Sequence, residues 1–147
     1  MRSRTEAREK AIQVIYSIFS TRDEDSNIKE LIPTLKDRIK QVEKFQDKGM
    51  TASQTEFIEY LLTETINNLD EIDTLIKKYV QNWDFHRISL IDKSVLRIAI
   101  MELVYSDTPN KVVINEAIEL AVNFSGVKSS KFINGILDAI MHKETKE

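Results

Sequence analysis

The sequence predicts an all-α protein, a single compact domain of about seven helices that spans residues 1–147. Three observations point to this class. Glycine and proline, on which tight β-turns depend, occur only 3 and 2 times in 147 residues. Apolar residues recur at every third or fourth position through each long segment, which is the helical period. A chain of this length fits one domain and buries enough surface to fold without disulfides or metals.

Helix start and stop signals in the sequence mark the ends of the predicted helices. Pro33 is tolerated only in the first turn of the second helix. Ser89 predicts the N-cap of the fifth helix, Gly126 ends the sixth, and Ser129 or Ser130 caps the seventh. The predicted helices cover about residues 5–20, 31–42, 57–66, 72–79, 89–105, 112–124 and 130 onward. Residues 21–27, 44–52 and 82–87 connect them, and Trp83 and Phe85 of the last connector should seal the core.

The composition excludes several classes of protein. The absence of cysteine rules out disulfides and thiolate zinc sites, and two histidines, His86 and His142, argue against a histidine metal site. The glycines lie too far apart for a phosphate-binding loop, and His86 is interpreted as a connector residue rather than a general base. We therefore expect no catalytic residue, metal or cofactor. No apolar run approaches the ~20 residues of a membrane helix, and no signal peptide is evident, so a cytoplasmic protein without membrane contact is expected.

Charge is unevenly distributed along the chain. The net charge is −3, but residues 1–22 carry five basic and two acidic groups. Residues 128–147 carry four basic and three acidic groups, whereas residues 23–127 carry 12 basic and 19 acidic groups. An acidic body suits a basic protein partner, and basic ends suit a phosphate backbone.

Polar residues interrupt the apolar stripes of the last three predicted helices. Burying them is costly unless each has a hydrogen-bond partner. We expect some of them to form a buried network that fixes helix register, with Asn115 structural and not a ligand contact. Gly135, in mid-helix, is expected to allow a close crossing of two helices. The interrupting residues are Arg97, Glu102, Asn115, Glu116, Asn134 and Asp138.

Two segments are candidate binding sites. Arg4 and Arg8 continue the apolar stripe of the first helix, and Tyr16 borders it. The two arginines suit an anionic ligand, and Tyr16 could contact the same ligand. Alternatively, the arginines pair with carboxylates elsewhere in the chain, and Tyr16 only packs against its neighbours. The predicted loop 124–132 leads into a helix start where free N–H groups, Lys128 and Lys131 could hold a phosphate. In that loop, Phe132 could stack a base or simply anchor the core.

The last third of the chain resembles the NusB family of bacterial antitermination factors. The resemblance is strongest over residues 94–138, where Ile114-Asn115-Glu116-Ala117 and Phe132-Ile133-Asn134-Gly135-Ile136-Leu137-Asp138 are quite specific. The segment from Arg8 to Tyr16 is similar to the opening helix of the family. Residues 21–80 match only as a helical pattern.

The resemblance implies an RNA-binding factor that binds boxA RNA of ribosomal transcripts together with NusE, a small-subunit ribosomal protein. Such a factor acts in the RNA polymerase antitermination complex. The NusE surface would include Asp92 and Lys93, and the protein would be a monomer or a homodimer. The implied RNA contacts are Arg4, Arg8, Tyr16, Lys128, Lys131 and Phe132.

Thr5 and Glu6 interrupt the arginine cluster that often opens family members, which implies weaker RNA binding alone and more dependence on the partner. The basic ends are expected to converge on one surface that holds a short single-stranded RNA. A helical adaptor without RNA contact is the alternative. A detached targeting domain of a ribosomal-RNA methyltransferase is a third possibility, because the chain lacks the reactive cysteine of such an enzyme.

Overall fold

The computed structural model describes residues 3–22, 27–43, 49–80 and 84–145. These residues form seven α-helices, α1 to α7, and two short 3-10 helices, η1 and η2, with no strand among them. The all-α prediction is therefore confirmed. None of the described helices has the length and apolar character needed to span a membrane. The chain divides into two compact units, residues 1–67 and 68–147, and each is described by itself.

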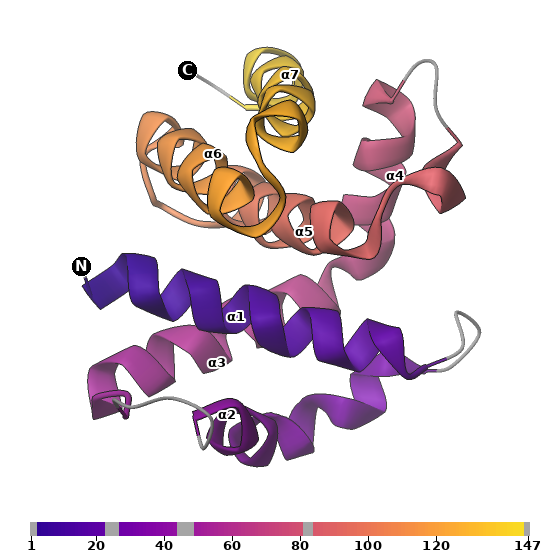
Figure 1. The fold of residues 1–147 in the computed structure, drawn as a ribbon. Helices are drawn as coiled ribbons and strands as arrows, with labels where there is room; N and C mark the ends of the chain where they lie inside the picture. Colours follow the sequence, from indigo (N-terminus) through magenta and orange to yellow (C-terminus); the bar gives the residue numbers. More distant parts are fainter. Residues whose placement is uncertain (1–2, 23–26, 44–48, 81–83, 146–147) are drawn as a thin grey trace. The chain divides into compact units, whose positions relative to one another are not determined.

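The first unit contains α1 (Ser3–Ser20), η1 (Ile28–Thr34), α2 (Leu35–Glu43) and α3 (Ala52–Asn67). Helix α1 packs against both α2 and α3 (Figure 1). The apolar stripe predicted for the first helix is buried, as are facing residues of the other two. The core residues are Ala7, Ala11, Val14, Ile15, Ile18, Leu35, Ile39, Ile58, Leu61, Leu62 and Ile66.

Pro33 lies outside α2. It sits in the 3-10 helix η1, which begins after Asn27, whose side chain accepts a hydrogen bond from the Lys29 N–H. Helix α2 starts at Leu35. The placement of Pro33 in the first turn of the second α-helix was therefore wrong. A proline ring disfavours α-helical backbone at the residue before it, so the regular helix begins only after the proline.

The second unit contains α4 (Leu69–Tyr79), η2 (Phe85–Arg87), α5 (Leu90–Tyr105), α6 (Asn110–Ser125) and α7 (Val127–Glu144). Helices α5, α6 and α7 pack against one another in pairs, and α4 packs against α5 and α7 (Figure 1). Apolar side chains from all four helices form the core. They include Ile72, Ile76, Leu96, Ile100, Leu103, Val113, Ala117, Leu120, Ile133, Leu137 and Ile140.

The start of α5 agrees with the sequence. The Ser89 hydroxyl accepts a hydrogen bond of 3.2 Å from the Asp92 N–H, so Ser89 is the N-cap. In the connector before it, Phe85 is buried as predicted. Trp83, the other aromatic residue of that connector, lies outside the described residues.

Gly126 both ends α6 and precedes α7. Its φ of +99° is a conformation that suits glycine, and its N–H donates to two carbonyls of the last turn of α6. Helix α7 begins at the next residue, Val127. A cap at Ser129 or Ser130 was therefore wrong, and the predicted loop 124–132 is almost entirely helical. One glycine reverses the chain, so no longer connection is needed.

Arg97 joins α5 to α4 through a buried ion pair. Its Nε and Nη2 donate to the two carboxylate oxygens of Asp73, at 2.9 and 3.0 Å. The Arg97 guanidinium also lies 5.7 Å from the ring centre of Phe85. Further along α5, the buried Glu102 carboxylate accepts a hydrogen bond of 3.2 Å from the Thr108 hydroxyl. The expected burial of interrupting polar residues with hydrogen-bond partners is confirmed at Arg97 and Glu102. Their role in fixing helix register stays a prediction.

Three other interrupting residues are not buried. Asn115, Asn134 and Asp138 are exposed on the outer faces of α6 and α7, so the structural role expected for Asn115 was wrong. Gly135 is also exposed, and apart from its chain neighbours and the backbone of α7 itself, no described atom lies within 4 Å of the position that a Cβ would take. The close helix crossing expected there was also wrong. Asn115, Asn134 and Asp138 each follow a buried residue by one position, which rotates them out of the core face.

Replacing Asp73 with alanine tests the buried ion pair. The variant leaves the Arg97 guanidinium buried without its carboxylate, so we expect the free energy of unfolding to fall by about 3 kcal/mol. Urea denaturation measures this change. The control is Thr74→Ala, an exposed position on the same helix, which should change stability by less than about 0.5 kcal/mol. Equal stability of the two variants would contradict the role of the pair.

Candidate nucleic-acid interface

The first two turns of α7 carry three of the predicted RNA contacts. Lys128 and Lys131 are exposed, and Phe132 is half-buried. They stand on a helix and not on the predicted loop. Residues spaced three and four apart lie on the same side of a helix, so Lys128, Lys131 and Phe132 form one short stripe, named here the α7 stripe.

A cavity of about 480 Å³ lies beside the α7 stripe. It is bounded by the starts of α5 and α7, the end of α6 and the connector before α5. Two cationic side chains, one carboxylate and three serines line it together with two apolar residues. These residues are Arg87, Ile88, Ser89, Asp92, Ser125, Lys128, Ser129 and Phe132.

Asp92 supplies the carboxylate of this cavity. Its side chain is buried, and its Oδ2 accepts a hydrogen bond of 3.3 Å from the Ser129 hydroxyl. Its Oδ1 is buried without a hydrogen-bond partner among the described residues. Burial raises the pKa of this carboxyl, and hydrogen bonds from Ser129, Ser89 and Ser125 act in the opposite direction. The hydrogen bonds to the ionised Asp92 carboxylate therefore do not fully offset the cost of burying its charge in the folded protein.

Lys93, the other residue predicted to meet a protein partner, has a different environment. It is buried, and its ammonium lies 4.5 Å from the ring centre of Phe85. The ammonium of Lys77, on α4, lies 4.9 Å from the same ring. Such cation–π contacts are worth about 0.5–1 kcal/mol or more when desolvated. Lys93 thus contributes to the packing between the start of α5 and its neighbours.

On α1, the two arginines meet an aromatic ring. The guanidinium carbons of Arg4 and Arg8 lie 3.9 and 5.3 Å from the ring centre of Phe57, on α3. Arg4 is exposed, whereas Arg8 is 6% exposed. Phe57 in turn stacks on Tyr60, with ring centres 6.2 Å apart and planes at 23°. Tyr16 and Tyr60 are each 41% exposed.

Sequence reasoning named neither Phe57 nor Tyr60 as a site residue. The ring of Phe57 is half-buried and carries both arginines. The spacing of Phe57 and Tyr60, three residues apart on one helix side, was the available signal. Arg87, Ser125 and Ser129 of the cavity were also missed as site residues, because they converge only through tertiary packing.

The predicted site residues belong to both units. Arg4, Arg8 and Tyr16 lie on α1 of the first unit, whereas Lys128, Lys131 and Phe132 lie on α7 of the second. Within the second unit, the structure brings Lys128, Phe132 and Asp92 to one cavity. The expected convergence of the basic ends on a single surface stays a prediction.

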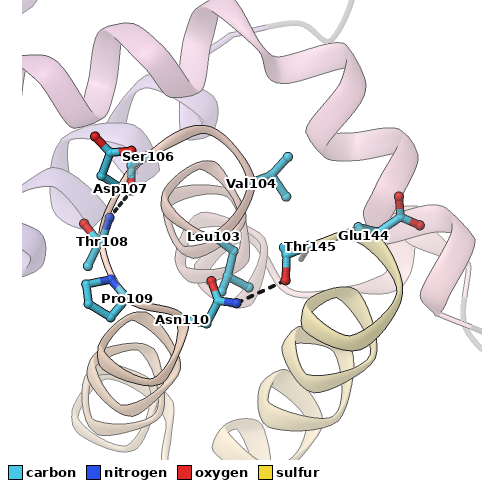
Figure 2. Close-up of a pocket in the computed structure, with 9 residues that line it drawn as sticks. All are labelled: Leu103, Val104, Ser106, Asp107, Thr108, Pro109, Asn110, Glu144 and Thr145. Carbon is cyan, nitrogen blue, oxygen red and sulfur yellow. Dashed lines mark hydrogen bonds between the residues drawn. The ribbon is translucent and has the colours of Figure 1, made fainter. Parts of the chain in front are cut away.

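A second cavity, of about 350 Å³, lies at the opposite ends of α5, α6 and α7 (Figure 2). There the Asn110 amide donates to the Thr145 hydroxyl at 3.1 Å, and the Thr108 N–H donates to the Ser106 hydroxyl at 3.2 Å. The lining residues include two carboxylates, Asp107 and Glu144, and no lysine or arginine. This end of the unit is therefore poorly suited to a phosphate backbone. Among the described residues, no group of three or more histidines or carboxylates is placed to hold a metal ion.

Comparison with known proteins identifies relatives over nearly the whole chain. The sequence profile of the NusB family matches residues 5–142. The transcription antitermination protein NusB of Chloroherpeton thalassium is 42% identical over 140 residues, which are 93% of this chain and 60% of that protein. The NusB of Nitratiruptor sp. is 37% identical over 146 residues, which are 99% of this chain and 96% of that protein. The chain therefore spans well under two thirds of the first relative and nearly all of the second.

Solved structures share the fold. A NusB structure from T. maritima has a TM-score of 0.79 and 31% sequence identity, and the match covers 97% of this chain and 92% of that chain. A structure of antitermination factors NusB and NusE in complex with dsRNA has a TM-score of 0.77 at 24% identity, over 97% and 98% of the two chains. The second likeness establishes the fold alone.

Replacing Asp92 with asparagine tests the burial of its carboxylate. Because burial raises the pKa of Asp92, the folded protein holds the proton more tightly than the unfolded chain. The stability contributed by this group is therefore present at low pH and is lost as the pH rises through the raised folded-state pKa. We expect Asp92→Asn to be more stable than the wild type at pH 7, by a margin that shrinks toward pH ~4.

Urea unfolding of both proteins between about pH 4 and 8 measures that margin. Asp107→Asn, at an exposed carboxylate beyond the other end of α5, is the control and should show no comparable gain at pH 7. A stability gain for Asp92→Asn that does not change with pH would contradict the assignment.

Proposed function

The chain belongs to the NusB family, and on that premise we propose that it is an RNA-binding transcription antitermination factor. It binds boxA RNA of ribosomal RNA transcripts together with NusE, within the RNA polymerase antitermination complex. The names of its relatives support this function. A protein of the same fold solved with NusE and dsRNA supports the choice of partners.

The observation that carries the proposal is the α7 stripe. Lys128 and Lys131 are exposed cations within one helical turn of each other, and the aromatic ring of Phe132 lies beside them. Single-stranded RNA is held by this combination, because cations neutralise phosphates and an aromatic face stacks a base. Residues 128–147 have a small excess of basic residues, whereas residues 23–127 are acidic overall.

The first unit offers a second RNA contact. The exposed guanidinium of Arg4 is held over Phe57, which restricts its motion without neutralising its charge. The rings of Tyr16 and Tyr60 are partly exposed on α1 and α3 of the same unit. Arg8 is more deeply placed and acts chiefly by positioning this group. We propose this surface as an RNA contact in its own right.

NusE is proposed to bind at the start of α5. Asp92 and Lys93 are buried there, so the partner meets the exposed residues next to them, including Arg87 and Ser89. Arg87 and Ser89 also line the cavity beside the α7 stripe. A partner bound at α5 is thereby adjacent to RNA bound at α7, which couples the two affinities reciprocally.

The proposed role needs no catalytic residue, metal or cofactor, and we propose that the protein is not an enzyme. Action on nascent transcripts places it in the cytoplasm. It works as a monomer or homodimer before it joins the polymerase complex. Any activity that depends on the additional length of the Chloroherpeton relative lies outside this proposal.

Replacing Lys131 with alanine tests the phosphate contact. We expect boxA RNA to bind more weakly and the slope of log affinity against log salt to flatten by roughly 0.7, the value for one phosphate contact of single-stranded RNA. Fluorescence anisotropy titrations between about 50 and 200 mM salt give both quantities. The control is Lys111→Ala, an exposed lysine at the far end of α6, which should keep the wild-type slope. An unchanged slope for Lys131→Ala would refute the contact.

The coupling with NusE separates this proposal from a pure adaptor. We expect saturating NusE to tighten boxA RNA binding by about 5- to 150-fold, the usual range for coupled sites. Gel-shift titrations with and without NusE measure the gain. NusE binding without any gain in RNA affinity would favour a helical adaptor that makes no RNA contact.

A further inference from the structure

Gly135 occupies a position that no contact among the described residues explains. It lies in the middle of α7 and is exposed, and apart from its chain neighbours and the backbone of its own helix, no described atom lies within 4 Å of the position of a Cβ. Among the described glycines, a positive φ occurs at Gly126 and not at Gly135. An alanine would therefore fit both the backbone and the space. In a helix interior, glycine is about 1 kcal/mol less favourable than alanine.

The α7 stripe leads directly to Gly135. Phe132, Lys131 and Lys128 precede it by three, four and seven residues, so all lie on the same side of the helix. Both lysines are exposed, and the bare backbone of Gly135 is the next surface along this side. One turn further, the carboxylate of Asp138 lies 3.5 Å from Nε2 of His142. An anionic chain entering along the lysines therefore reaches Gly135 before it reaches Asp138.

We propose that the ribose–phosphate backbone of bound RNA packs directly against the α7 backbone at Gly135. This inference rests on the proposed RNA-binding function and adds a contact residue to it. The missing side chain lets a ribose approach the helix more closely than any other residue would allow, while Lys131 and Lys128 hold the phosphates on one side. The Asn134 amide, exposed beside Gly135, can donate to or accept from a ribose hydroxyl or base edge.

The chemistry around Gly135 favours RNA over a protein helix. A bare helix backbone can also receive a second helix, but the centre of a protein–protein interface is depleted of charged residues. Gly135 is surrounded instead by Lys131, Asn134 and Asp138, all exposed. RNA offers both the negative charge that the lysines need and hydroxyl groups for the amide.

Two substitutions at Gly135 test the contact in the full chain. Gly135→Ala should raise the thermal unfolding midpoint by about 2–4 °C and yet weaken binding of a boxA RNA oligonucleotide about fivefold or more. Its salt dependence should match the wild type, because no charge is lost. Gly135→Lys should weaken binding further, although it adds a cation to a cationic surface.

Thr74→Ala is the matched control, because it also improves helix propensity at an exposed position, on α4. It should leave RNA affinity unchanged. The inference is overturned if Gly135→Ala binds boxA RNA with wild-type affinity, or if Gly135→Lys binds it more tightly. In either case the proposed function stands, whether or not NusE binding changes. If the wild type itself fails to bind boxA RNA in the presence of NusE, both the inference and the proposed function are overturned.

Discussion

The chain reversal at Gly126 determines where every proposed RNA contact on α7 lies. With a φ of +99°, this glycine ends α6, returns its N–H to the carbonyls of that helix, and lets α7 begin at the next residue. Lys128 and Ser129 consequently fall in the first turn of α7, beside Asp92 and Ser125. Any other residue would be strained in this conformation, and a longer connection would move the α7 stripe away from the cavity.

The start of α5 is held by contacts of a different kind. Arg97 ties α5 to α4 through Asp73, and its guanidinium shares the ring of Phe85 with Lys93. Breaking one partner of a buried ion pair costs more than the pair contributes, so these residues act as a unit. They fix the residues that line the cavity from the α5 side. The site therefore depends on a polar layer as well as on the apolar core.

The sequence predicted the positions of the helices better than it predicted which side chains face the core. Helical period located all seven helices, and the cap at Ser89 followed from its side-chain chemistry. Asn115 and Asn134 were misplaced because each stands next to buried residues, and an error of one position turns a side chain by about 100°. Phe57 was not recognised as a site residue because sequence alone does not show that two arginines from another helix lie over its ring. The cavity at Asp92 was likewise beyond sequence reasoning, since the four segments that bound it meet only after folding.

Charge explains why RNA should follow the outer face of α7 and not enter the cavity. The cavity wall contains the Asp92 carboxylate, whose Oδ1 already lacks a hydrogen-bond partner among the described residues. A phosphate in the cavity would be attracted by Arg87 and Lys128 but repelled by that buried carboxylate, and charges interact more strongly in such a poorly hydrated setting than in water. On the outer face, Lys128 and Lys131 stand in solvent and attract phosphates without this penalty. The proposed RNA path therefore runs along the exposed lysines, and the next surface on that path is the uncovered backbone at Gly135.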